Sequence, residues 1–280
     1  MKKTRWLVGF VLLVLGGVQA AMLDLIGGGA STNGFQYWSD PANWSGGAVP
    51  GTADAPRIRY GMQDRDKLYL DASPTVSTVT VLDDIQAQFK GTGTLTLFDY
   101  LNLAYANAGV DLMDSVTLSV GNRIRLTTGT TAINLYDDAV LSTKGVSFDK
   151  PGSKLLVTLN GKSTYSQIAL PQVTENMEEG TQIVLNDSST LNVETLTAEK
   201  FYDGWIAAGA TFYLNDSASI VFHSARGNSS LIKLYNEAGF LVINGATNAV
   251  KGLDYTYENG VLQVNQKIRI NSSEHAGFDL

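Results

Sequence analysis

The 280-residue sequence predicts an all-β fold, a single-stranded parallel β-helix with an N-terminal cap. Three observations support this prediction. From about residue 75 onward, short apolar segments alternate with turns rich in Asp, Asn, Ser and Gly. A seven-residue motif recurs along the same region, and helical periodicity is weak after the first twenty residues. Glycine is frequent (28 residues) and proline scarce (6 residues), which suits a chain with many tight turns.

Residues 1–20 have the pattern of a cleaved secretory signal peptide. Lys2, Lys3 and Arg5 form a basic start, an apolar run covers residues 6–18, and small residues follow at the expected cleavage site. The apolar run is shorter than the ~20 residues of a membrane-spanning helix. We therefore expect a secreted or cell-surface protein whose mature chain is not inserted in the membrane. A retained N-terminal anchor is the alternative.

The mature chain is expected to be strongly acidic. The sequence has 20 basic and 27 acidic residues, and loss of three basic residues with the signal leaves 17 against 27, a net charge of −10. Nucleic acids and anionic lipids require a basic face, so we expect neither as a partner. The sequence has no cysteine, so stability would come from burial and hydrogen bonding alone.

Residues 21–60 are predicted to cap the first coil. The end of a β-helix presents an unpaired strand edge and an open apolar core, and both promote aggregation unless they are covered. Trp38 and Trp44 offer large apolar faces for this purpose. Pro50 and Pro56 lack the N–H group that a further strand would need, so they are expected to block additional pairing.

Residues 61–280 are predicted to form the β-helix itself, with irregular coils of 20–30 residues. The recurring motif is an aliphatic residue, any residue, Asp, three mostly small residues and a second aliphatic residue. Its five copies begin at Leu97, Leu112, Leu135, Leu185 and Leu214. The interval of 50 residues between the third and fourth copies would hold two coils.

The motif has a physical interpretation as a corner between two short strands. The two aliphatic residues, such as Leu185 and Leu191, are expected to point inward. The Asp between them would lie at the corner, because its backbone tolerates left-handed geometry and its carboxylate accepts backbone N–H groups. Equivalent strands of successive coils would then stack about 4.8 Å apart.

An antiparallel β-sandwich or jelly roll is the alternative fold. Such folds join long alternating strands by Asn-Gly or Asp-Gly hairpin turns. Four dipeptides could serve as these turns: Asn160-Gly161, Asp203-Gly204, Asn244-Gly245 and Asn259-Gly260.

The segment WSDPANWSGGAVPGTADAPRI, residues 38–58, resembles the N-terminal motif of bacterial exported β-helix proteins related to autotransporter-associated β-strand repeat passenger domains. The matching residues are Trp38, Asn43, Trp44, Gly46, Gly47, Pro50, Gly51 and Asp54. A looser match, GTGTLTL, covers residues 91–97. The resemblance implies a right-handed β-helix that is secreted or displayed on the cell surface. The sequence shows no C-terminal membrane barrel or sorting tail, so the mode of surface attachment stays open.

Residues that could carry out catalysis are few. His223 and His275 are the only histidines, and neither belongs to a metal-binding or triad pattern. Close carboxylate pairs occur at Asp64/Asp66, Asp83/Asp84 and Asp137/Asp138. Turn capping is the first interpretation of these pairs, a weak calcium site the second, and general acid–base catalysis the last. We therefore expect no catalytic residue and no cofactor, with calcium as a weak possibility at Asp83, Asp84, Asp137 and Asp138.

Residues 201–205, FYDGW, interrupt the repeat most clearly. Tyr202 and Trp205 are the candidates for a carbohydrate contact, because aromatic rings in a loop can stack on sugar rings. The alternative is that these aromatic residues pack along the flank of the helix and shield its core.

These observations together predict a secreted or cell-surface β-solenoid with a structural or adhesive role and no catalysis. The alternative is a carbohydrate-active module, either a polysaccharide lyase or a carbohydrate binder. In both cases the expected partner is a cell-surface or extracellular polysaccharide.

Overall fold

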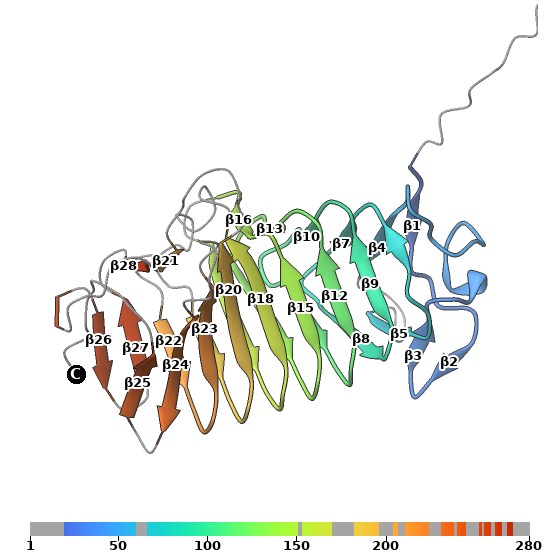
Figure 1. Ribbon diagram of the computed structural model, residues 1–280. Helices are drawn as coiled ribbons and strands as arrows, with labels where there is room; N and C mark the ends of the chain where they lie inside the picture. The colour runs from blue at the N-terminus through green and yellow to red at the C-terminus, as the bar shows by residue number, and fades with distance from the viewer. Residues whose placement is uncertain are drawn as a thin grey trace, which may run out of the picture.

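The computed structural model describes most of the chain between residues 20 and 270. The described ranges are 20–59, 66–150, 153–169, 182–195, 204–206, 211–223, 231–237, 240–244, 252–253, 255–258, 261–264 and 268–270. Apart from one short 3-10 helix, η1 (Pro41–Asn43), the regular elements in these ranges are β-strands. They form an elongated parallel β-solenoid of about five turns (Figure 1).

Three sheets make the sides of the solenoid. The first sheet has the order β1-β4-β7-β10-β13-β16. Its strands are β1 (Met22–Asp24), β4 (Ala55–Ile58), β7 (Val79–Val81), β10 (Leu101–Leu103), β13 (Ile124–Leu126) and β16 (Val146–Phe148). The second sheet contains β2 (Ser31–Thr32), β3 (Phe35–Tyr37), β5 (Lys67–Leu70), β8 (Gln86–Gly91), β11 (Gly109–Leu112), β14 (Thr130–Leu135), β17 (Lys154–Leu159), β19 (Gln182–Leu185), β22 (Thr211–Leu214), β27 (Val261–Val264) and β26 (Tyr255–Glu258).

The third sheet forms the row of strands at the front of Figure 1. It contains β6 (Thr75–Val76), β9 (Thr94–Leu97), β12 (Thr117–Val120), β15 (Val140–Thr143), β18 (Thr164–Ala169), β20 (Thr190–Thr195), β23 (Ser219–His223), β24 (Leu231–Glu237) and β25 (Phe240–Asn244). Two further strands, β21 (Gly204–Ile206) and β28 (Ile268–Ile270), pair only with each other.

From β4 to β18, each coil visits the three sheets in the same order, whereas the later strands β19, β20, β22 and β23 belong only to the second and third sheets. For example, β7, β8 and β9 lie in the first, second and third sheets, and β10, β11 and β12 repeat the cycle one layer further on. Thr94 pairs with Thr117 and Thr117 with Val140, which are steps of 23 residues. Later steps lengthen, to 29 residues between Thr190 and Ser219. The chain is therefore a parallel solenoid, as the sequence predicts.

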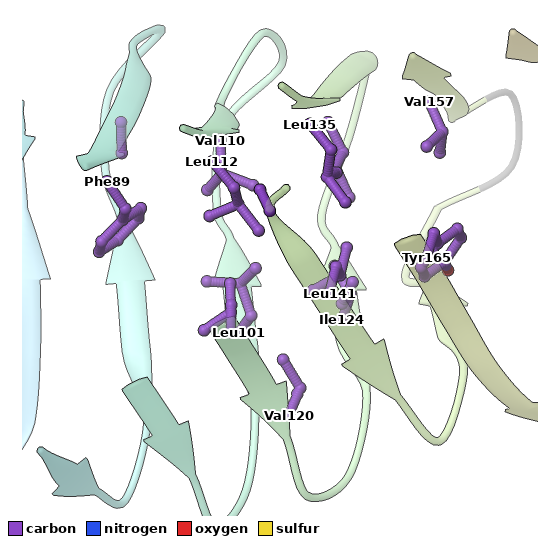
Figure 2. Packing of buried hydrophobic residues seen from close by; sticks show 14 of the residues in the cluster. Phe89, Leu101, Val110, Leu112, Val120, Ile124, Leu135, Leu141, Val157 and Tyr165 are labelled. Atoms are coloured by element: carbon purple, nitrogen blue, oxygen red, sulfur yellow. The ribbon is translucent and has the colours of Figure 1, made fainter. Parts of the chain in front are cut away.

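The core consists of columns of apolar side chains that run along the solenoid. In the second sheet, Leu112 pairs with Leu135, and in the third sheet Leu118 pairs with Leu141, all four fully or almost fully buried. Figure 2 shows such side chains from successive coils filling the space between the sheets. The inward orientation predicted for Leu185, Leu191, Leu214 and Ile220 is confirmed, because each is at most 1% exposed.

Four of the five motif copies occupy equivalent corners, between the second and third sheets. They begin at Leu112, Leu135, Leu185 and Leu214 and join β11 to β12, β14 to β15, β19 to β20, and β22 to β23. The expectation that the copy at Leu97 marks the same corner is wrong, because this copy joins β9 of the third sheet to β10 of the first. The expected extra coil between residues 135 and 185 exists, and Asn160-Gly161 forms its corner between β17 and β18.

The antiparallel sandwich is not the fold, although antiparallel pairing occurs late in the chain. Asn160-Gly161 joins strands of two different sheets and is not a hairpin turn. After β23, however, β24 and β25 extend the third sheet in antiparallel fashion, and β27 and β26 do the same for the second sheet. The sequence motif did not indicate this change of direction.

The segment that was predicted to cap the first coil also contributes strands to two of the sheets. β1 pairs with β4 in the first sheet, and β3 pairs with β5 in the second. The expectation that Pro56 blocks pairing is wrong, because Pro56 lies inside β4, opposite Leu23 of β1. β4 itself is a full member of the first sheet, since it also pairs with β7.

Candidate functional site

The corner aspartates have the left-handed backbone that the motif requires. Asp114, Asp137, Asp187 and Asp216 have φ angles of 58°, 57°, 56° and 53°. At the equivalent corner of the coil between them, Gly161 has a φ of 68°. Asp and Gly tolerate this conformation better than most other residues, which explains why only these two residue types occupy this corner in the five coils from Asp114 to Asp216.

The carboxylates at these corners accept hydrogen bonds from the neighbouring coil. Asp137 Oδ2 accepts the N–H of Asp114 at 3.2 Å, and Asp216 Oδ2 accepts that of Asp187 at 3.3 Å. Asp187 Oδ2 accepts the N–H of Gly161 at 2.8 Å. The sequence predicts a carboxylate that accepts backbone N–H groups, and the structure adds that the donor belongs to the preceding coil. These side chains tie one coil to the next.

An amide ladder lies beside the aspartate corner. The Asn215 side chain donates to Asn186 Oδ1 at 2.7 Å, and the Asn186 side chain donates to Asn160 Oδ1 at 2.9 Å. Asn160 in turn donates to the Leu135 carbonyl at 3.3 Å. Stacked amides of this kind stabilise in-register parallel strands, so this second polar row also connects neighbouring coils.

The calcium candidates are divided between two different corners. Asp83, with a φ of 64°, and Asp84 follow β7, whereas Asp137 and Asp138 follow β14. Asp84 Oδ1 accepts the Asn107 N–H at 3.3 Å, so this carboxylate also contacts the next coil. Over the described ranges, no group of three or more His, Asp or Glu side chains is arranged to hold a metal ion. Calcium binding therefore stays a prediction without a site.

Asn43 is the centre of the N-terminal cap. The side chain is fully buried, and its Oδ1 accepts the N–H groups of Gly28 and Gly29 at 3.1 and 2.8 Å. Its Nδ2 donates to the carbonyls of Ala30 and Tyr37, both at 3.0 Å. One amide thus fixes two segments of the cap, which explains a buried asparagine in an apolar setting.

Trp38 and Trp44 belong to the buried apolar core. Each is 1% exposed, and their rings meet edge to face with centroids 4.9 Å apart. Trp44 Nε1 donates to the Trp38 carbonyl at 3.0 Å. Figure 1 places β1, β2 and β3 of the same segment at one end of the solenoid. The two tryptophans are therefore as deeply buried as the cap hypothesis predicts.

Two aspartates organise the cap loops. Asp40 precedes η1, and its carboxylate accepts the N–H groups of Ala30 and Ala42 at 2.6 and 2.9 Å; these bonds lower the pKa of Asp40. Asp54 accepts the N–H groups of Gly51 and Ala21 at 2.7 and 3.2 Å. Pro50 is buried in the loop before β4. All of these contacts are structural.

The aromatic and histidine candidates are placed only in part. Tyr202 and His275 lie outside the described residues. The backbone of Trp205 belongs to β21, where it pairs with Arg269 of β28 in a small sheet apart from the three main ones. His223 is the last residue of β23. A carbohydrate contact by Tyr202 and Trp205 stays a prediction.

Sequence reasoning missed a nearly buried aspartate on the outer face of the second sheet. Asp111 in β11 is 9% exposed. Its Oδ1 accepts hydrogen bonds from the amides of Gln86 and Asn134 at 2.9 and 2.8 Å. Partial burial raises the pKa of Tyr136, and the charge of Asp111 raises it further. The sequence did contain a signal for this residue: Asp111 lies between Val110 and Leu112 within a strand, where a carboxylate cannot cap a turn. Amide donors hold this carboxylate in place.

The described part of the chain contains no helix long and apolar enough to cross a membrane. Comparison of the sequence with protein-family models and with curated proteins finds no match, and comparison with solved structures finds none either. The function is therefore argued from the geometry of the molecule itself.

Proposed function

We propose that this chain is a secreted or cell-surface β-solenoid with a structural or adhesive role and no catalytic activity. The main support for the proposal is that the carboxylates at the corners and in the cap segment accept structural hydrogen bonds from the backbone. Asp137, Asp187 and Asp216 accept backbone N–H groups from neighbouring coils, and Asp40 and Asp54 accept those of the cap loops. A carboxylate engaged in this way is poorly suited to general acid–base catalysis, which needs access to the substrate.

The support for secretion comes from the sequence. The basic start and apolar run of residues 1–20 support a signal peptide. The resemblance of residues 38–58 to exported β-helix proteins supports surface display. An elongated stack of coils offers long, regular outer faces, which suits multivalent adhesion to an extended polymer.

A carbohydrate-active module is the second candidate. One feature of the fold supports it: β21, which contains Trp205, leaves the three-sheet pattern between β20 and β22. Insertions of this kind are where a solenoid can build a binding loop. A lyase would require calcium or a basic residue near such a loop, together with a groove for the substrate.

Incubation of the purified mature protein with a polysaccharide panel, with and without calcium, separates these candidates. The structural or adhesive role predicts no unsaturated products and no new reducing ends under either condition. Turnover of any polysaccharide would refute that role. Calcium-dependent turnover that is lost in Trp205→Ala, with Phe98→Ala as an exposed aromatic control elsewhere on the solenoid, would support the carbohydrate-active module.

A further inference from the structure

The three outer faces of the solenoid differ in charge. Charged side chains project from strands of the first sheet at Asp24, Arg57 and Arg125, and from strands of the second at Lys67, Lys90 and Lys154. In the third sheet, the outward side chains that the structure describes on β6, β9, β12, β15, β18, β20 and β23 carry no charge. In a chain with a net charge of −7, this face differs clearly from the other two.

Two parallel columns make up this uncharged face. Registered pairing aligns the first column as Thr94, Thr117, Val140, Thr164, Thr190 and Ser219. The second column is Thr75, Thr96, Ser119, Ser142, Ser166 and Asn192. All of these side chains are half-exposed. Glu194 and His223 pair beyond the columns at the ends of β20 and β23, where side chains are not described.

The columns form a regular array of hydrogen-bonding groups. Neighbours along a column are about 4.8 Å apart, and the two columns are about 7 Å apart. Ser142 Oγ donates to Ser119 Oγ at 3.3 Å, and Thr190 Oγ1 lies 3.4 Å from Ser219 Oγ. These long contacts keep the side chains in line. Because a hydroxyl has one donor and two acceptor positions, each retains capacity for a partner.

We propose that this face of the third sheet binds a neutral polysaccharide chain. Sugar hydroxyls both donate and accept hydrogen bonds, as the face does, and neither surface carries charge. Each described column is about 24 Å long, and the face is two side chains wide, a shape that suits an extended polymer with a repeating unit. The proposal rests on the adhesive role proposed above, and it assigns the partner and the surface.

Other partners fit this face less well. A protein partner would need apolar or aromatic anchors, and both columns lack aromatic side chains. Nucleic acid would need basic residues. An ice surface would require side chains of uniform length, whereas Val140 lacks a hydroxyl and Asn192 is longer than its neighbours.

Two serine-to-lysine variants in one coil test the face. Ser142 lies in β15 of the third sheet and Ser147 in β16 of the first, and both are half-exposed. Ser142→Lys places a charge in the centre of the array, and Ser147→Lys makes the same change on a different face. Binding is measured by co-sedimentation with cellulose, β-1,3-glucan and xylan, and with the charged polymers alginate and polygalacturonate.

We expect the parent and Ser147→Lys to bind at least one neutral polysaccharide equally well and without turnover. Ser142→Lys should weaken that binding by at least about tenfold, because the new charge would be desolvated without a partner. Melting curves check that both variants fold. If Ser142→Lys is destabilised, Ser119→Lys on the neighbouring strand replaces it.

Three results would overturn the assignment of this face: no retention on any neutral polysaccharide, retention on charged polymers only, or equal weakening by both lysine variants. Equal weakening would leave an adhesive role intact while refuting the site. Release of sugar products would instead refute the non-catalytic role. Inhibition of ice growth that Ser142→Lys abolishes, without polysaccharide binding, would identify a different partner for the same face.

Discussion

Asn43 shows how single polar residues support this fold. The side chain is fully buried, and its amide uses two acceptor and two donor positions, as described above. A buried amide is costly unless it is paired, and here the pairing holds residues 28–30 against Tyr37 at the end of β3. The residue therefore connects the segments of the polypeptide that surround the two tryptophans.

We expect Asn43→Ala to lower the free energy of unfolding by about 2–4 kcal/mol, because it leaves backbone donors and acceptors of the cap without partners. The control is Asn102→Ala, which removes a single long hydrogen bond to Thr80 of 3.4 Å and should cost less than about 1 kcal/mol. Urea denaturation measures both values. Equal losses for the two variants would mean that Asn43 is not the centre of the cap.

Asp40 should make the cap sensitive to acid. Hydrogen bonds from the N–H groups of Ala30 and Ala42 lower its pKa below the ordinary value of 3.8. A lowered pKa contributes stability above the ordinary value, and that contribution is lost as the pH falls through the folded-state pKa. The parent should have a higher melting temperature than Asp40→Asn, by the same amount at pH 7 and at pH 5. This difference in melting temperature should become smaller near about pH 3. A difference that stays constant or widens at pH 3 would contradict this assignment.

Sequence reasoning succeeded for residues whose role is local and failed for those whose role depends on distant partners. The left-handed aspartates could be predicted because Asp at a corner has few alternatives. Asp111 could not, because its partners Gln86 and Asn134 are brought beside it only when three coils stack. The complete hydrogen bonding of Asn43 was missed for the same reason.

At the scale of elements, stability comes from repetition between coils. Leu191 of β20 lies between Tyr165 of β18 and Ile220 of β23, and all three are buried. Its neighbour along the strand, Asn192, points outward and is half-exposed. A strand with this alternation has one register, since a shift by one residue would bury its polar face.

Leu191→Asp should therefore unfold the neighbouring coils, because it buries a charge that has no partner. Asn192→Asp introduces a carboxylate one residue away on the outer face, where it should cost less than about 1 kcal/mol. Circular dichroism melting curves compare the two variants. If Leu191→Asp keeps the melting temperature of the parent, the inward assignment of this column is wrong.

The repeat motif predicted most of the elements because a corner aspartate marks the same point of each coil. It failed at Leu97, where a similar pattern occurs at the corner between the third and first sheets. The coil that turns at Gly161 has no copy of the motif, because glycine replaces aspartate there, and only the spacing of the neighbouring copies predicted it. The antiparallel strands after β23 carry no such corner, so the motif gave no signal for them.

At the scale of the whole molecule, the two ends of the stack differ. Residues 21–54 cover one end with two buried tryptophans and contribute β1 and β3. At the other end, the direction of pairing changes, and β24, β25, β26 and β27 extend two sheets in antiparallel fashion (Figure 1). Neither end repeats the parallel coil geometry, which should oppose end-to-end stacking of molecules.

Loss of the N-terminal cap should turn the protein into an oligomer whose size depends on concentration. Deletion of residues 21–51 removes both tryptophans but keeps β4, so the apolar end of the first coil becomes exposed while strand content stays high. Trp44→Ala should act in the same direction and cost about 3–5 kcal/mol. Light scattering and circular dichroism measure both effects, with Phe98→Ala as a control, because Phe98 is 62% exposed. A truncated chain that stays monomeric and equally stable would show that the segment is not a cap.

The in-register stacking of coils is most directly tested by one distance across the third sheet. Thr94 and Ser219 lie in the same column, five strand steps apart. The sequence has no cysteine, so cysteines introduced at these two positions can carry the only spin labels in the protein. Double electron–electron resonance should give a narrow distribution centred near about 24 Å, five steps of about 4.8 Å. A broad distribution, or one centred far from this value, would contradict the solenoid.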